Sequence, residues 1–398
     1  MAIMNPIQQR IEAMNERVAQ VKEAGWYFYL QPLEELDGAW VTTGGRRMLL
    51  FAGYSYLGLL GHPKITAAAQ EALARYGTGT QGVRILAGTL PLHDELEETI
   101  ARFKKTEAAI VYSSGYVTNL ATVSALVGRN DVVICDKYNH ASIVDGCLLS
   151  QAKFVRFRHN DMAGLERRLQ QADPNAGKLV VVDAVFSMDG DVINLPEVSR
   201  LCREYDALLM VDEAHSVGVL GETGHGIEEH FGLNNAIDLY MGTLSKPIPS
   251  VGGYVAGKQE IITYLKHVAR AFVFSASLPP AQTAAAKASF EVIEEETWRV
   301  KMLQRNVELF LGGLKARGFN TLNSETPIVP IICGEDERAF QMAKACQEGG
   351  LFVLPVVSPA VPVGLARLRA NVTVDHSEED IAYALDVFER AGKAVGVI

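Results

Sequence analysis

Lys246 is the residue whose surroundings point most clearly to chemistry. It follows Gly242, Thr243 and Ser245 in the segment MGTLSKPIPSVGGYVAG, residues 241–257, and a glycine pair and an apolar run come after it. Most lysines are solvated surface charges, but small residues and apolar flanks predict a tight, backbone-rich pocket for this one. Burial lowers the pKa of a lysine because it penalises the charged form. A lysine tuned in this way can form a Schiff base with an aldehyde.

An apolar strand pattern with a polar end precedes this lysine. The segment MVDEAH, residues 210–215, ends in Asp212, Glu213 and His215. A carboxylate at the end of a buried strand suits a protonated pyridine nitrogen as its partner. Asp212 and Lys246 together therefore predict a site for a pyridine aldehyde.

Two earlier segments have the same form. AAIVYSSGYVTN, 108–119, places Ser114, Gly115 and Tyr116 at a strand-to-helix turn, where free backbone N–H groups suit a phosphate. In KLVVVDAVFSMDGD, 178–191, a buried strand leads to Ser187. Each of these turns could also be an ordinary connection between a strand and a helix. The evidence for a shared site is therefore that all of them follow the ends of strands.

Apolar strands and helices alternate from about 108 to 241, which predicts a parallel sheet with helices on both faces. Right-handed crossovers bring the carboxyl ends of such strands to one edge. Ser114, Ser187, Asp212 and Lys246 all fall at that edge, and we expect them to share one site.

These motifs, in this order, resemble the α-oxoamine synthases from about Asn5 to about Arg390. The resemblance includes Asp-Glu-Ala-His at 212–215, Gly-Thr-Leu-Ser-Lys at 242–246 and Gly-Gly-Tyr at 252–254. It implies an α/β, aspartate-aminotransferase-like fold that binds pyridoxal 5'-phosphate (PLP). It also implies a homodimer with shared active sites, to which the segment 272–280 and an N-terminal helix contribute.

The resemblance implies a role for each matching residue. Lys246 would hold PLP covalently and remove the Cα proton, and Asp212 would keep the pyridine nitrogen protonated. His140 would stack on the ring, and His215 and Ser187 would lie near its phenolic oxygen. The residues implied at the cofactor phosphate are Ser114, Gly115, Tyr116, Thr243, Ser245 and, across the dimer interface, Ser275.

Three positions need comment. Relatives usually carry threonine where this chain has Ala276, and Ser275 or Ser277 could replace it. Arg369 is the residue that aligns with the arginine gripping the substrate carboxylate, an ion that suits an arginine fork. Arg367 is the nearby alternative for that role, and Tyr54 stands at a substrate position where many relatives have asparagine.

Members of this family condense a small amino acid with an acyl thioester and release CO₂. Tyr54, Ser245 and the segment HNDMAGLERRL at 159–169 favour the serine palmitoyltransferase branch. Pro247 and Pro249, which stiffen the loop after the lysine, are not typical of that branch. The alternatives are 8-amino-7-oxononanoate synthase and glycine C-acetyltransferase, and more distantly an aminotransferase or lyase of this fold or a cofactor-binding protein without turnover. The amino acid, the acyl length and the choice between CoA and a carrier protein stay open.

The organisation predicted is an N-terminal helix (5–24) with short strands in residues 1–55, a large PLP-binding α/β domain in 56–284, and a smaller α+β domain in 285–398. The last unit begins with one long helix over 281–316 and continues with short strands near 327–332 and 351–356 and helices near 336–348 and 377–392.

Other function classes find little support. A net charge of −10 argues against a nucleic-acid partner. The GxGxxG match at 77–82 follows a helix pattern, whereas dinucleotide binding needs a preceding strand. DEAH with GGYVAGK lacks the hydroxyl of a P-loop, because Gln259 stands there. Five scattered cysteines without CxxC spacing predict neither disulfides nor a metal site. They suit a cytoplasmic protein, and no signal peptide or transmembrane run is present, although peripheral membrane association stays open.

Overall fold

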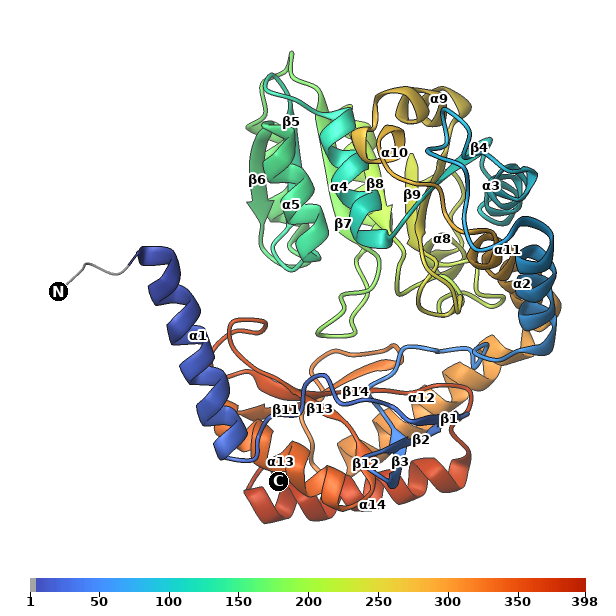
Figure 1. The fold of residues 1–398 in the computed structure, drawn as a ribbon. Helices are drawn as coiled ribbons and strands as arrows, with labels where there is room; N and C mark the ends of the chain where they lie inside the picture. Colours follow the sequence, from blue (N-terminus) through green and yellow to red (C-terminus); the bar gives the residue numbers. More distant parts are fainter. Residues whose placement is uncertain (1–4) are drawn as a thin grey trace.

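The computed structural model describes residues 5–398, so residues 1–4 of the first predicted unit lie outside the described part. Two layered parts face each other, one built on a large sheet and one on smaller sheets and long helices (Figure 1). Segments from both the N-terminal and the C-terminal region of residues 5–398 lie together in the second part.

The large part is organised by a seven-stranded sheet in the order β4-β10-β9-β8-β7-β5-β6. Strands β5 to β9 pair in parallel, and β10 is antiparallel to both of its neighbours. The predicted mostly parallel α/β fold is therefore confirmed. The strands are β4 (Ala108–Tyr112), β5 (Val132–Asp136), β6 (Lys153–Phe157), β7 (Lys178–Asp183), β8 (Leu208–Asp212), β9 (Leu239–Thr243) and β10 (Gly253–Gly257).

Helices cover both faces of this sheet because its central strands are apolar on both sides. Successive side chains of β7 enter different cores, Val180 and Val182 on one face and Leu179 and Val181 on the other. The first core contains side chains of α2 (Pro63–Tyr76), α3 (Pro91–Phe103), α6 (Met162–Gln170), α7 (Leu195–Glu204), α8 (Ile227–Phe231) and α11 (Pro280–Glu295). The second contains those of α4 (Gly115–Leu126), α5 (Ala141–Ser150), α9 (Gln259–Val268) and α10 (Arg270–Val273).

The second part combines both ends of the described chain. Its three-stranded antiparallel sheet has the order β11-β14-β13, and β12 pairs in parallel with β3 of an N-terminal meander. The elements are β1 (Glu35–Asp37), β2 (Trp40–Thr43), β3 (Arg46–Leu50), α12 (Trp298–Ala316), β11 (Ile328–Gly334), α13 (Asp336–Glu348), β12 (Leu351–Phe352), β13 (Leu354–Val356), β14 (Ala366–Asn371) and α14 (Glu378–Val395).

The predicted single helix over 281–316 is wrong, because the chain breaks it into α11 and α12. Glu296 leaves the helical region of the backbone, and its carboxylate binds His62 and Arg299. Helix α11 packs on α2 and α3, whereas α12 runs from the large core at Leu303 into the small core at Val307. A straight helix could not follow both cores. The domain boundaries 55 and 284 themselves stay a prediction.

Helix α1 (Pro6–Glu23) confirms the predicted N-terminal helix. The side chain of Asn5 caps it by accepting the Ile7 N–H at 2.9 Å, as expected of a residue with a short polar side chain. None of its residues is buried, and it extends away from the two layered parts (Figure 1). Within residues 5–398 we find no helix with the length and apolar character needed to span a bilayer.

Phe51 connects the N-terminal segment to the small core, and replacing it tests that connection. Its ring packs against Phe310, His376 and Phe388 and is fully buried. We expect Phe51→Ala to lower the free energy of unfolding by about 3–5 kcal/mol, measured by denaturant titration. Leu36→Ala, at an exposed site, is the control and should change little. Equal stability of the two variants would contradict the assignment of Phe51 to this core.

Candidate active site

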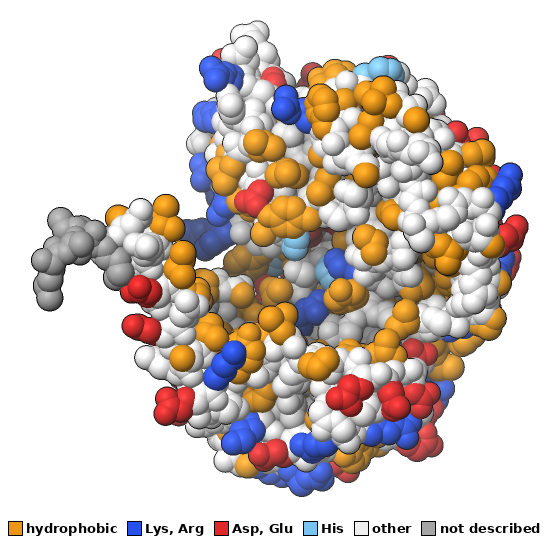
Figure 2. Space-filling view, viewed as in Figure 1, with side chains coloured by type: hydrophobic (Ala, Val, Ile, Leu, Met, Phe, Trp, Pro, Cys, Tyr) orange, Lys and Arg blue, Asp and Glu red, His pale blue; other side chains and the backbone are white. Residues whose placement is uncertain are grey.

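A cavity of about 280 Å³ opens at the carboxyl edge of the large sheet. The surface is hollowed there between the two parts, with histidine and cationic side chains visible inside (Figure 2). The cavity brings together most of the predicted site. Its lining residues are Ser114, Gly115, Tyr116, Asn119, His140, Ser142, Asp183, Ser187, Asp212, Ala214, His215, Met241, Thr243, Ser245 and Lys246.

Lys246 follows β9 and lies at the centre of a chain of polar contacts. Its Nζ is 2.9 Å from His215 Nε2, and His215 Nδ1 is 2.9 Å from the Tyr56 hydroxyl. Burial lowers the pKa of Lys246 to about 8, although the negative charges of Asp212 and Asp183 act to raise it. Burial and the Lys246 charge also lower the pKa of His215 well below its usual value. A neutral imidazole offers one donor and one acceptor, which matches a hydroxyl on one side and an amine on the other.

Asp212 ends β8 as a buried carboxylate with fixed orientation. Its Oδ2 accepts a hydrogen bond from Asn119 Nδ2 at 2.7 Å, and its Oδ1 accepts the Ala214 N–H at 2.9 Å. The same Asn119 nitrogen donates to Ser142 Oγ at 2.9 Å. A buried anion held in this way suits a heterocyclic N–H⁺, which would supply the charge partner that burial demands.

Asp183 ends the neighbouring strand β7 in register with Asp212. Its Oδ2 accepts the backbone N–H of His140 at 2.7 Å. Burial and the Asp212 charge raise the pKa of Asp183 well above its usual value, because two close carboxyl groups resist double ionisation. The His140 ring is also held from its own helix, since its Nδ1 lies 2.7 Å from Ser142 Oγ.

Small residues and hydroxyls form the end of the cavity near helix α4. Ser114 begins α4 as its N-cap and accepts the Val117 N–H at 3.2 Å, and the N-terminus of a helix favours an anion. Thr243 Oγ1 lies 2.9 Å from Ser245 Oγ. A Cβ built on Gly115 would come within 2.9 Å of Thr243 Oγ1, so glycine is needed for this close approach. Helix N–H groups and hydroxyls suit a phosphate, and the residues present fit PLP.

The two candidate arginines lie on one face of β14 and contact the same segment. Arg369 Nε donates to Ser187 O at 2.6 Å. Besides burial, the Arg369 charge contributes to the lowered pKa values of Lys246 and His215, so its guanidinium lies near both. Arg367 instead is paired with Asp189 and has a side chain only 1 % exposed. Arg369 is therefore better placed to meet a substrate.

Tyr54, Ser275 and Arg369 were predicted to belong to the site but do not line this cavity. Tyr54 is exposed nearby. Ser275 lines a separate crevice with Arg84 and Tyr112, and Ser277 Oγ donates to Gly82 O at 3.2 Å. Tyr116 lines the cavity, but its hydroxyl is directed to Asp145.

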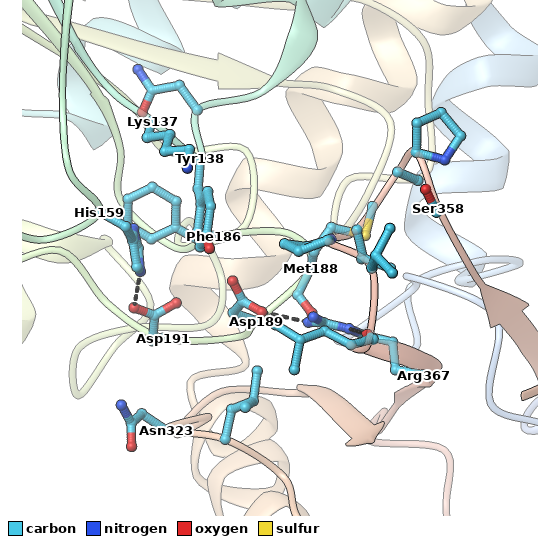
Figure 3. Close-up of a pocket in the computed structure, with 18 of the residues that line it drawn as sticks. Lys137, Tyr138, His159, Phe186, Met188, Asp189, Asp191, Asn323, Ser358 and Arg367 are labelled. Atoms are coloured by element: carbon cyan, nitrogen blue, oxygen red, sulfur yellow. Dashed lines mark hydrogen bonds and ion pairs between the residues drawn. The ribbon is translucent and has the colours of Figure 1, made fainter. Parts of the chain in front are cut away.

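A second cavity of about 680 Å³ adjoins the first (Figure 3). The segment after β7 separates them, since Ser187 lines one cavity and Met188 and Asp189 line the other. Lys137 and Arg156 are exposed lining residues. The apolar lining consists of Tyr138, Phe186, Met188, Leu322, Pro359, Ala360, Val361, Pro362, Val363 and Leu365.

His159 forms part of the wall of this second cavity. Its Nδ1 is 3.1 Å from Asp136 Oδ1 and its Nε2 is 2.8 Å from Asp191 Oδ2 (Figure 3 shows the Asp191 contact). Burial opposes the charged ring, but the two carboxylates outweigh it and raise the pKa of His159 to about 10. His159 thereby connects the loop that leads to His140 with the segment that carries Ser187.

Four site residues were not predicted from the sequence: Tyr56, Asn119, Ser142 and Asp183. A signal existed for Asp183, which ends its strand as Asp212 does, and for Tyr56, which begins a Tyr-Leu-Gly motif. Asn119 and Ser142 lie inside helical patterns, and only their spatial placement reveals them.

Comparison with known proteins identifies the family. The aminotransferase class I and II family model matches residues 46–388. The 8-amino-7-oxononanoate synthase of Geobacter sulfurreducens is 46 % identical over 381 residues, 95 % of this chain and 97 % of the relative. The chain belongs to the α-oxoamine synthases. Two further proteins that this α-oxoamine synthase resembles are serine palmitoyltransferases. The serine palmitoyltransferase of Sphingobacterium spiritivorum is 42 % identical over 97 % of each chain. The structure of a serine palmitoyltransferase from S. paucimobilis with bound PLP–myriocin aldimine matches with a TM-score of 0.95 and 35 % identity, over 99 % of this chain and all of that one.

The contribution of Asp212 to the charge balance can be measured in the apoprotein of this enzyme. Asp212 favours the charged form of Lys246, so we expect Asp212→Asn to shift the pKa of Lys246 below about 8. The readout is the pH dependence of amine labelling of Lys246, followed by peptide mass spectrometry. The exposed Asp173→Asn variant is the control. An unchanged or raised pKa in Asp212→Asn would contradict the charge balance described above.

His159 predicts a specific pH dependence of stability. The folded-state pKa is raised to about 10, so its ion pairs contribute fully below the unfolded value of about 6.5 and are lost as the pH rises towards 10. We expect the difference in melting temperature between the wild type and His159→Gln to be largest near pH 6 and to shrink by pH 10. A difference that grows with pH would show that the ring is neutral in the folded protein.

Proposed function

We propose that this α-oxoamine synthase condenses serine with a long-chain acyl thioester and releases CO₂ and the free thiol. The observation that carries the choice of acyl group is the 680 Å³ cavity beside the site of Lys246. Phe186, Met188 and Leu365 line its interior. Of the cations lining it, Arg367 and His159 are already paired with Asp189 and Asp191, and Lys137 and Arg156 are exposed to solvent. An apolar chain suits this lining better than an acyl group with a terminal carboxylate does.

The residues divide the work as follows. Bound PLP supplies an electron sink that makes the substrate Cα–H bond acidic. Lys246 would hold the cofactor covalently and would also take the Cα proton, for which a pKa of about 8 suits a base near neutral pH. Asp212 keeps the ring nitrogen protonated. His140 orients the ring, and Arg369 binds the amino-acid carboxylate.

His215, Ser187 and the helix α4 end complete the arrangement. Tyr56 positions His215 through its hydroxyl, so that His215 would donate a hydrogen bond to the phenolic oxygen of the cofactor. Ser187 lines the same cavity and would also lie near that oxygen. Ser114, Gly115, Tyr116, Thr243 and Ser245 hold the phosphate, and Tyr54 borders the amino-acid side. In the condensation a C–C bond to Cα forms as the acyl C–S bond breaks, and the departing thiolate takes up a proton to give the free thiol. The bond from Cα to the carboxylate then breaks to release CO₂, and a proton returns to Cα.

Product analysis tests this proposal. Each of carboxyl-labelled serine, alanine and glycine is combined with palmitoyl-, pimeloyl- or acetyl-CoA, and labelled CO₂ and free thiol are counted. We expect equal amounts of both, highest with serine and palmitoyl-CoA. Turnover with alanine and pimeloyl thioester alone would identify an 8-amino-7-oxononanoate synthase, the second candidate, which the 46 % identity with the Geobacter enzyme favours. Thiol release without labelled CO₂ would overturn the decarboxylative condensation.

We also propose a homodimer with shared active sites. Leu86 and Phe274 are strongly exposed on two segments that pair with each other at Val83 and Ala276. Ser275 lies in this pair of segments, outside the cavity of its own protomer, and Ser277 remains the alternative at this contact. The face of α1 with Ile7, Ile11 and Met14 is also uncovered. A large exposed apolar surface is typical of an interface.

A charge on this surface tests the dimer. Phe274 is 73 % exposed in the protomer, so Phe274→Asp should leave the protomer folded but yield a monomer with weakened PLP binding. Light scattering and PLP titration give the readouts. A fully active wild-type monomer would contradict shared sites.

A cytoplasmic location completes the proposal, because five free buried cysteines suit a reducing compartment.

A further inference from the structure

Glu213 lies between two residues of the cofactor cavity, yet its side chain points away from it. Asp212 and Ala214 line the cavity and Glu213 does not, as expected where successive residues of an extended chain face opposite sides. The Glu213 carboxylate instead pairs with Lys104 at 2.5 Å, and the two side chains are 0 % and 3 % exposed. Charged side chains are rarely buried so completely, and those that are buried have a partner of opposite charge.

The pair connects three elements behind the cavity. Lys104 follows the last residue of α3 and donates to His225 O at 2.5 Å. Glu213 accepts the Ile227 N–H at 2.9 Å, at the start of α8, and the Ser216 hydroxyl at 3.2 Å. The site is built tightly around these contacts.

Gly226 shows how little room remains. Its φ is +106°, and a Cβ there would lie 2.1 Å from Glu213 Oε1 and 3.1 Å from Lys104 Nζ. A side chain at this position would therefore displace the carboxylate. The backbone allows the pair to close only because residue 226 is glycine.

The turn after Glu213 transmits this anchoring to the site. The Glu213 N–H donates to Met241 O at 2.7 Å, and the Ser216 N–H donates to Glu213 O at 3.0 Å. His215 lies inside this turn, and Asp212 immediately precedes it. A short turn whose backbone is held at both ends leaves little freedom for the residues between.

We propose that Lys104 and Glu213 are positioning residues that set where Asp212 and His215 stand against the cofactor and Lys246. The inference rests on the proposed function only in taking PLP as the group in the cavity. Neither residue touches the cavity, so any effect on cofactor affinity must pass through the turn from Asp212 to His215.

The test is a charge-free pair of similar volume, Lys104→Met with Glu213→Gln, because replacing a buried ion pair in this way is often neutral for stability. We expect the apoprotein to melt close to the wild type. PLP affinity and kcat should each fall by about 10- to 100-fold, the range that a small misplacement of reacting groups can cost. The KM for the acyl thioester should stay the same.

Two further variants sharpen the result. Gly226→Ala keeps both charges but displaces the carboxylate, so it should weaken PLP binding in the same way. Lys287→Met with Glu95→Gln removes a partly exposed pair and should change neither PLP affinity nor kcat.

Wild-type PLP affinity and kcat in the Lys104–Glu213 double variant would overturn the proposal. So would losses that only follow a matching drop in the melting temperature of the apoprotein, since that pattern marks a general stabilising role. PLP affinity is measured without substrates, so a failure of the proposed condensation would not affect the role proposed for Lys104 and Glu213.

Discussion

The site depends on one electrostatic constraint, which is that a primary amine and two carboxyl groups share one cavity and are largely buried in it. Burial disfavours the charged form of Lys246 and of Asp183, and it also disfavours a charged His215. Asp212 is the group whose negative charge the surroundings support, through Asn119 and the Ala214 N–H. The charges therefore balance with few ionised groups, and the cavity retains one anion to meet a cationic ring and one amine that deprotonates near neutral pH.

The large sheet makes this concentration of groups possible. Parallel strands β7 and β8 pair in register and end at Asp183 and Asp212, so two acids from separate strands become neighbours at the edge of the sheet. The small part then supplies Arg369 from β14, whose neighbour Arg367 binds the same loop through Asp189. The two arginines attach the loop carrying Ser187 to the small part, so the site is built across both cores.

Much of this was predictable from the sequence. The strand-end pattern identified Ser114, Ser187, Asp212 and Lys246, because strand periodicity and crossover handedness are local or general rules. The break between α11 and α12 was not predictable, since it occurs where the chain passes from packing on α2 and α3 to packing on the small core, and no local pattern reports that change. β14 was missed as well, because the alternation in ARLRAN was interpreted only as a substrate-binding segment. Asn119 and Ser142 act through a contact between two helices, which no periodic pattern reports.

The antiparallel placement of β10 has a consequence for how the site forms. Thr243 and Gly253 are partners in the β9–β10 hairpin, and the Leu244 N–H donates to Gly252 O at 2.9 Å, so the loop that carries Lys246 is closed at its base by local contacts. Local pairings form early because little chain entropy is lost in closing a short loop. The parallel neighbours β7 and β8 require whole crossovers before they can pair. The hairpin thus fixes the shape of the lysine loop through local contacts, whereas the two acids meet only through a pairing that spans a whole crossover.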